Sequence, residues 1–161
     1  MWQPCWFYKK QNGTMKLLDT NLWLALSLSG HSHHLAARKW FDEQTDSGSI
    51  AFCRATQQSF LRLMTTEGVL SVYGNKPLSN AEAWAGYEAL MADDRVIFCP
   101  EPSGLDAIWK KLAARRSSSP KLWMDAYLAA FAITRDADLI TIDKAFSQFP
   151  GLGVLVIEKI A

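Results

Sequence analysis

The decisive stretch of the sequence is MKLLDTNLWLALS, residues 15–27. Its first part, residues 15–18, is a short apolar run that predicts a buried strand, and residues 21–27 predict a helix directly after it. Asp19 stands at the junction, immediately behind the strand. Downstream, short apolar runs keep alternating with helical segments, which is the pattern of a parallel sheet covered by helices on both faces.

The same periodicity assigns the rest of the chain. Further strands are predicted at residues 50–54, 96–99, 139–142 and 154–157, and further helices at 31–44, 56–66, 79–90, 104–115 and 122–134. We therefore expect an α/β protein with a three-layer α/β/α fold, whose central, mostly parallel sheet has about five strands. A chain of 161 residues has room for one domain, which we assign to residues 15–161.

Residues 1–14 stay outside this fold argument, as an extension that is native, non-native or a misassigned start. They lack the basic and apolar regions of a secretory signal.

No apolar run in the chain approaches the roughly 18 residues of a membrane span. Three cysteines, an odd number without metal-ligand spacing, favour reduced thiols. We expect a cytoplasmic protein that does not contact membranes.

The overall composition excludes a disordered chain but points to no partner. Hydrophobic residues make up 49% of the chain and charged residues 20%, which is ordinary for a globular domain. The formal net charge is only +1. Any argument for binding nucleic acid must therefore rest on a local patch of charge.

Three aspartates, Asp19, Asp125 and Asp143, are predicted to meet at one edge of the sheet. Asp19 and Asp143 each follow an apolar strand, where open parallel sheets bind their ligands. Asp125 lies in the first turn of an antiparallel helix, whose start is at the same edge. Two carboxylates about 5 Å apart repel by roughly 3 kcal/mol at an effective dielectric of about 20, which favours a proton or a bridging divalent cation. Mg²⁺ suits an all-oxygen site, so we infer a hydrolase of phosphodiesters.

Each aspartate also has a purely structural interpretation. Asp19 could cap the helix that follows it. Asp125 could complement a helix dipole, and Asp143 could begin a turn. Spacing alone leaves these alternatives open.

Three segments around these acids resemble a known family. They are LLDTNLWLAL at 17–26, WMDAYLAAFA at 123–132 and LITIDKAF at 139–146. In order and content they are similar to the signature segments of PIN-domain nucleases, above all to the VapC toxins of bacterial toxin–antitoxin pairs. The likeness spans residues 15–161 and implies a PIN-like fold.

The resemblance also implies an activity and a site. It makes Asp19, Asp125 and Asp143 the catalytic ligands of Mg²⁺, or of Mn²⁺, in a ribonuclease, with Asn21 and Thr141 as their polar neighbours. It further implies a small antitoxin protein as partner and a homodimer.

One departure from the family concerns the helix after the second strand. Family members usually carry a Glu there, whereas this chain has Ser59 at or near that position, with Gln57 close by. A hydroxyl or an amide can hydrogen-bond a metal-bound water but adds no charge. We therefore expect a single firmly held ion. The alternative is a catalytically weak or inactive module that binds RNA or a protein.

A basic patch precedes the helix that bears Asp125. It holds five cations in twelve residues: Lys110, Lys111, Arg115, Arg116 and Lys121. A solvated helix face would explain such a run equally well. Arg115, Arg116 and Lys121 are the stronger candidates for RNA binding, because their serine-rich loop can reach the cleft.

Two other interpretations are set aside. His31 and His34 would share a helix face, but they lack a third ligand nearby in the sequence, which favours an exposed helix start. A phosphatase of the haloacid dehalogenase type also begins with Asp after its first strand. That family needs a second Asp two residues later, and this chain has Asn21 there.

Overall fold

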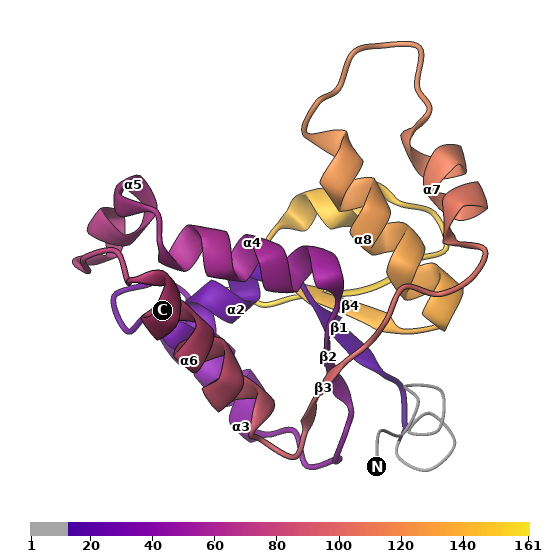
Figure 1. Ribbon diagram of the computed structural model, residues 1–161. Helices are drawn as coiled ribbons and strands as arrows, with labels where there is room; N and C mark the ends of the chain where they lie inside the picture. The colour runs from indigo at the N-terminus through magenta and orange to yellow at the C-terminus, as the bar shows by residue number, and fades with distance from the viewer. Residues whose placement is uncertain (1–12) are drawn as a thin grey trace.

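The computed structural model describes residues 13–161 and contains one parallel sheet of five strands (Figure 1). Its strand order is β3-β2-β1-β4-β5, and every neighbouring pair is parallel. The strands are β1 Lys16–Leu18, β2 Ile50–Phe52, β3 Val96–Phe98, β4 Asp138–Thr141 and β5 Gly153–Val156. The predicted fold class is confirmed. Most of the proposed extension, residues 1–12, lies outside the described residues.

Helices cover both faces of the sheet and form the outer layers (Figure 1). One face carries α2 Thr20–Ser27, α3 His34–Asp42, α4 Arg54–Met64, α5 Glu67–Leu70 and α6 Asn80–Met91. The other face carries α7 Leu105–Ala113 and α8 Leu122–Arg135. Two short 3-10 helices, η1 Ser71–Tyr73 and η2 Lys144–Gln148, complete the described elements.

The two-residue period of the strands divides the core into two clusters. Leu18 and Phe52 face the cluster under α2, α4 and α6, whereas Leu17 faces the one under α8. In the first cluster, Trp23 of α2 stacks on Phe52 with ring centroids 3.7 Å apart. In the second, α8 presents small buried side chains to the sheet, namely Ala126, Ala129, Ala130 and Ala132. Small side chains let this helix pack close to the sheet.

Three predicted boundaries are wrong for local reasons. The helix predicted from residue 31 begins at His34, because turns occupy the preceding residues. The helix predicted from residue 56 begins at Arg54, since the Thr56 hydroxyl accepts the Cys53 N–H and starts the first turn early. The segment after residue 66, where no helix was predicted before residue 79, contains α5 and η1.

The cysteines correct one expectation. Cys53 is a free, buried thiol whose pKa is raised by that burial. Cys99 is buried as well but is disulfide-bonded, so the prediction of reduced thiols is wrong there. Sequence spacing says nothing about which side chains meet in space. Within residues 13–161, no helix is long and apolar enough to cross a membrane.

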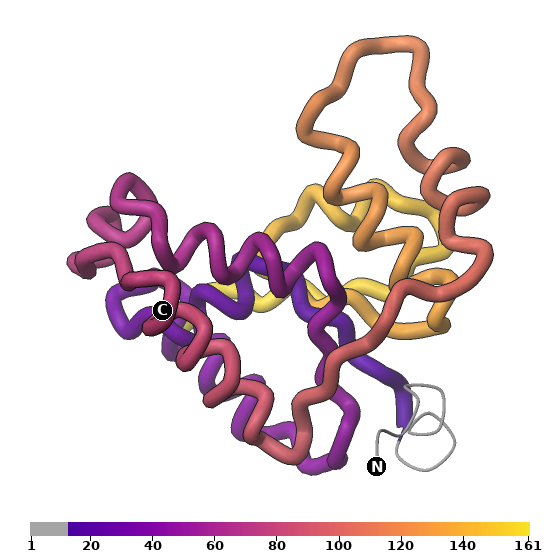
Figure 2. The backbone as a smooth tube through the Cα atoms, in the orientation of Figure 1, coloured from indigo at the N-terminus to yellow at the C-terminus, as the bar shows by residue number. Residues whose placement is uncertain are grey.

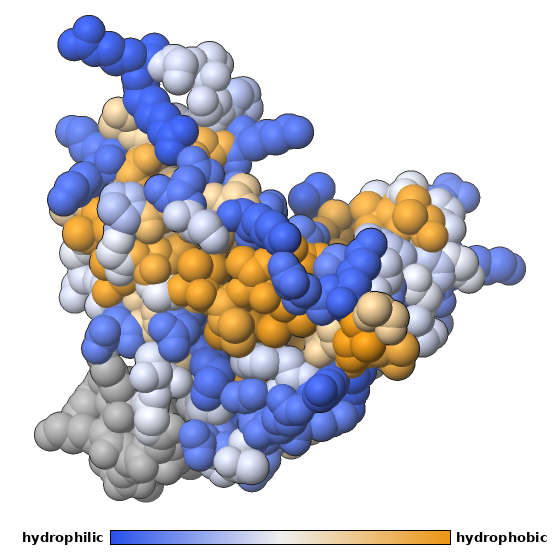
Figure 3. Space-filling view, turned by 180° about the vertical axis from the view of Figure 1, so that it is seen from behind, coloured by the Kyte–Doolittle hydropathy of each residue, from blue (hydrophilic) through white to orange (hydrophobic). Residues whose placement is uncertain are grey.

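The surface on the β5 side is partly apolar. Seen from behind, an apolar band crosses the middle of the molecule (Figure 3). The large apolar side chains that remain exposed include Leu155 of β5 and Ile160 near the C-terminus. Leu155 belongs to an edge strand, whose outer backbone groups have no neighbouring strand among the described residues.

Candidate active site

Asp19, Asp125 and Asp143 gather at the carboxyl edge of the sheet. Asp19 directly follows β1, and Asp143 lies two residues beyond the end of β4, its neighbour in the sheet. Asp125 is in the first turn of α8. The charges of Asp125 and Asp143 both act on Asp19, and that of Asp143 acts on Asp125. The three carboxylates therefore share one electrostatic environment.

Asp19 is the buried member of the three, with only 7% of its surface exposed. The pKa of its carboxyl is raised from 3.8 to about 6, chiefly by burial, and the charges of Asp125 and Asp143 act in the same direction. Hydrogen bonds from the Thr141 hydroxyl and the Thr20 backbone act in the opposite direction. Desolvation dominates because the carboxylate has lost most of its contact with water.

The Thr141 hydroxyl links two of the aspartates. It donates to Asp19 Oδ2 at 3.0 Å and accepts the backbone N–H of Asp143 at 2.9 Å. Thr141 is fully buried. Asp143 is exposed, and its Oδ1 accepts the Ala145 N–H at 2.8 Å, which caps η2. One hydroxyl therefore sets the position of both strand ends.

Asp125 completes the acidic edge without a balancing cation. It is half-buried, and its pKa is raised by burial and then by the charge of Asp143. Among residues 13–161, no ion pair joins any of the three aspartates to a Lys or Arg. The edge therefore carries uncompensated negative charge, which favours protons or a cation from solution.

The carboxylates are gathered but do not form a closed ligand set. In the part of the chain that the structure describes, no three His, Cys, Asp or Glu side chains lie close enough together to hold a metal ion. Asp19 is fixed by Thr141, whereas Asp143 is exposed and Asp125 half-buried. The donor chemistry of three carboxylates fits a hard divalent cation.

The other predicted polar neighbours, Asn21, Gln57 and Ser59, form no hydrogen bond with the three aspartates among the described residues. Asn21 is exposed on α2, and it has no hydrogen bond to the three aspartates in the described structure. Gln57 is buried on α4, and its Oε1 accepts a hydrogen bond from Arg54 Nη1. Ser59 is half-buried on the same helix, which contains no acidic residue. No carboxylate from α4 therefore reaches this edge.

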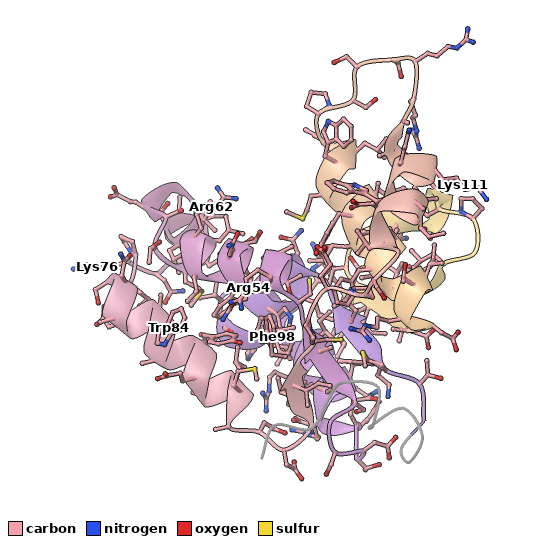
Figure 4. All side chains as sticks on the ribbon, turned by 45° about the vertical axis from the view of Figure 1, so that its right-hand side comes forward. Arg54, Arg62, Lys76, Trp84, Phe98 and Lys111 are labelled. Atoms are coloured by element: carbon pink, nitrogen blue, oxygen red, sulfur yellow. The ribbon has the colours of Figure 1, made fainter. Side chains whose placement is uncertain are left out.

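The basic candidates divide into two groups. Arg115, Arg116 and Lys121 are exposed in the segment between α7 and α8, which projects from the body beside the start of α8 (Figure 2). Arg115 Nη2 donates to Gln148 Oε1 at 2.9 Å, which ties this segment to η2, directly after Asp143. Lys111 instead points outward from α7 (Figure 4).

Sequence reasoning missed Arg54 and Tyr127. Arg54 opens α4 just behind β2, and its guanidinium lies 4.6 Å from the Phe98 ring centroid. Both are labelled near the centre of Figure 4. The strand-end position that singled out Asp19 would also have found Arg54. Tyr127, two residues after Asp125, donates its hydroxyl to Glu101 Oε2 at 2.9 Å, and burial raises its pKa. No sequence signal connects that pair.

A parallel sheet between helical layers, with aspartates behind β1 and β4 and in the first turn of α8, defines the class of PIN-like domains. The chain belongs to the PIN domain family, whose family model matches residues 16–152. It is 54% identical over 146 residues to Ribonuclease VapC41 of Mycobacterium tuberculosis, covering 90% of this chain and all of that relative. It is also 31% identical to Ribonuclease VapC31 of the same organism, covering 84% and 93%.

Solved structures show the same fold at low identity. VapBC2 from Rickettsia felis, in a crystal structure bound to a DNA fragment from their promoter, has a TM-score of 0.63 at 13% identity, covering 89% of this chain and 99% of that chain. Mycobacterium tuberculosis VapC20, a sarcin-ricin loop cleaving toxin, has a TM-score of 0.61 at 16% identity, covering 86% and 98%. At these identities the match concerns the fold alone.

Proposed function

We propose that this protein is a metal-dependent endoribonuclease that acts as the toxin of a type II toxin–antitoxin pair. The observation that carries the proposal is the uncompensated acidic edge formed by Asp19, Asp125 and Asp143 on a PIN domain. The high identity to a protein named Ribonuclease VapC41 supports the same activity. The reaction is hydrolysis of phosphodiester bonds in single-stranded or structured RNA.

The cofactor we propose is Mg²⁺, with Mn²⁺ as a substitute, held by Asp19, Asp125 and Asp143. When bound, such an ion stabilises the charge on a phosphate and lowers the pKa of water. Asp19 is the pre-positioned ligand, because burial and the Thr141 hydrogen bond hold its carboxylate in place. The raised pKa of Asp19 also disfavours its charged form until a cation is present.

The composition of α4 supports our proposal for the number of ions. Since that helix contributes no acid, three carboxylates must serve the whole site, and we propose one firmly held ion. Ser59 and Gln57 would then act, if at all, through hydrogen bonds. The same missing acid favours the second candidate, a catalytically weak or inactive PIN-like module that binds RNA or a protein.

Substrate and partner contacts form the rest of the proposal. Arg115, Arg116 and Lys121 would contact the phosphates of RNA from the segment before α8. A small antitoxin protein would hold the enzyme inactive, and the active form would be a homodimer. Related folds are known in VapBC assemblies and in a toxin-antitoxin complex from Klebsiella pneumoniae, which supports such a partner. We place the activity in the cytoplasm.

Cleavage of single-stranded RNA by the wild type, with Mg²⁺, Mn²⁺ or EDTA, tests the proposal. Asp19→Asn and Asp125→Asn should lower the rate at least about 100-fold, because each would remove a ligand of the ion. Asp106→Asn, an exposed charge in the first turn of α7, is the matched control and should keep full activity. Cleavage that persists in both site variants would exclude the three-aspartate site. Tight RNA binding without cleavage at any metal concentration would favour the inactive module.

A further inference from the structure

An aromatic pocket of about 370 Å³ lies beside the acidic edge. Its lining consists of Ala55, Trp109, Pro120, Trp123, Met124 and Tyr127. Ala55 is in the first turn of α4, just behind β2, and Met124 is in the first turn of α8, one residue before Asp125. The pocket therefore lies at the same edge of the sheet as the aspartates. Its volume falls in the range of small-molecule sites, about 300–1,000 Å³.

The rings of this pocket are held in place by the protein itself. Trp109 Nε1 donates to the Trp123 carbonyl oxygen at 3.0 Å. The Trp109 ring meets Trp123 and Tyr127 edge to face, at centroid distances of 6.1 and 5.4 Å. The Tyr127 hydroxyl is anchored on Glu101. Rings that are already ordered lose little side-chain freedom when a ligand binds.

One wall of the pocket is left open to solvent. Trp123 is 56% exposed and Met124 45% exposed, although both are large apolar side chains. Two cations lie in the adjoining segment: Lys121 precedes α8 directly, and Arg116 lies earlier in the same segment, while the acids Asp125 and Glu101 stand beside Met124 and Tyr127. Aromatic faces next to cations are the combination that proteins use to bind single-stranded nucleic acid, in which bases stack on rings and cations contact phosphates.

We propose that this pocket binds an unpaired nucleobase of the RNA, next to the phosphate that is cleaved, with Trp123 as the stacking ring. The inference rests on the proposed ribonuclease function and adds a base-binding subsite to it. The inference rests on this proximity, because a nucleotide whose phosphate approaches Asp125 places its base within reach of two pocket residues at the start of α8, Met124 and Tyr127. A stacking site of this kind selects unpaired, unstacked bases over a continuous helix, since a base inside a helix has both faces covered by its stacked neighbours.

Binding experiments separate the subsite from the catalytic function. Asp19→Asn serves as the background, so that labelled RNA oligonucleotides are bound without being cut, and fluorescence anisotropy gives the dissociation constant. Adding Trp123→Ala should weaken binding by about 5- to 150-fold, the range measured for one base stacked on an aromatic ring. Trp123→Phe should recover most of the affinity. Trp84→Ala is the matched control, because Trp84 is 47% exposed on α6, outside the pocket (Figure 4).

A second perturbation places the base. The cleaved bond is first mapped with the wild type, and the nucleotides flanking it are then replaced one at a time by abasic residues. One of these abasic replacements should weaken binding to the Asp19→Asn protein that keeps Trp123, by the same factor as the Trp123→Ala change does. The same replacement should have no further effect on the protein that already carries Trp123→Ala. Thermal unfolding of the variant verifies that the fold is intact.

Three outcomes would overturn the inference. Trp123→Ala and Trp84→Ala could change the dissociation constant equally. The abasic and Trp123→Ala effects could multiply, which would mean that base and ring act independently. Trp123→Ala could leave RNA binding intact and instead weaken binding of a purified antitoxin, which would assign the pocket to a protein partner. A wild type that neither binds nor cleaves RNA would refute the proposed function itself, which is a separate result.

Discussion

Replacing Asp19 with Asn should make the metal-free protein more stable at alkaline pH. Burial raises the pKa of the Asp19 carboxyl from 3.8 to about 6. The folded state then binds this proton more tightly than the unfolded state. The contribution of Asp19 to the free energy of unfolding is therefore fully present below about pH 4 and is lost as the pH rises through about 6. Above that range the ionised carboxylate costs about 3 kcal/mol. An Asn amide avoids this cost and still accepts the hydrogen bond from Thr141.

Urea unfolding in EDTA, near pH 4 and near pH 8, measures the effect. We expect the free energy of unfolding of Asp19→Asn to exceed that of the wild type by about 1–3 kcal/mol near pH 8, and the difference to shrink below about 0.5 kcal/mol near pH 4. Asp106→Asn should show no such pH-dependent gain. Mg²⁺ should stabilise the wild type but not Asp19→Asn, by about 2.7 kcal/mol at 100 times its dissociation constant.

The sign of the difference in free energy of unfolding between Asp19→Asn and the wild type near pH 8 tests this prediction. If Asp19→Asn is equal to or less stable than the wild type in EDTA, the buried charge is compensated inside the metal-free fold, and the reasoning is refuted. A gain of the same size at both pH values would also refute it, because removal of an ionised group must act only where that group is ionised.

Three further changes have distinct expected outcomes. Thr141→Val removes the hydroxyl that holds Asp19, and should lower the free energy of unfolding by about 1–3 kcal/mol and weaken Mg²⁺ binding, as urea and metal titrations will measure. Ser79→Ala removes the N-cap of α6, and should cost about 1 kcal/mol in urea unfolding without changing Mg²⁺ binding. The double change Arg116→Gln and Lys121→Gln should reduce the slope of log affinity for single-stranded RNA against log salt by about 1.4, as anisotropy at several salt concentrations will test.

The sheet could be predicted from the sequence because each of its strands is a short apolar run. Leu17 and Leu18 show why: in a parallel sheet buried on both faces, neighbouring residues are both apolar, so the run is continuous. The ends of the helices could not be predicted as well, because they depend on hydrogen bonds of side chains whose partners the sequence does not reveal. The early start of α4 comes from the Thr56 hydroxyl, and α5 forms although it contains Gly68, a residue type that weakens helices.

The site could be predicted only as far as strand ends reveal it. Asp19 and Asp143 follow strands, and the structure brings both to the hydroxyl of Thr141. The burial of Asp19 and the exposure of Asp143 depend on the layers above them and leave no mark in the sequence. The aromatic pocket could not be predicted from the sequence either, since Trp109 and Trp123 meet only because α7 and α8 pack together.

Because β1 comes first in the sequence but lies in the middle of the sheet, the proposed site can be completed only late in the synthesis of the chain. Asp19 and Thr141 are 122 residues apart in sequence, and β1 lies between β2 and β4. At about 5–20 residues per second, a ribosome needs about 6–24 s to make the intervening chain. Throughout that interval the growing chain holds Asp19 but lacks Asp143. With the proposed three-aspartate site, this ribonuclease has no complete active site for most of the time that it is attached to the ribosome.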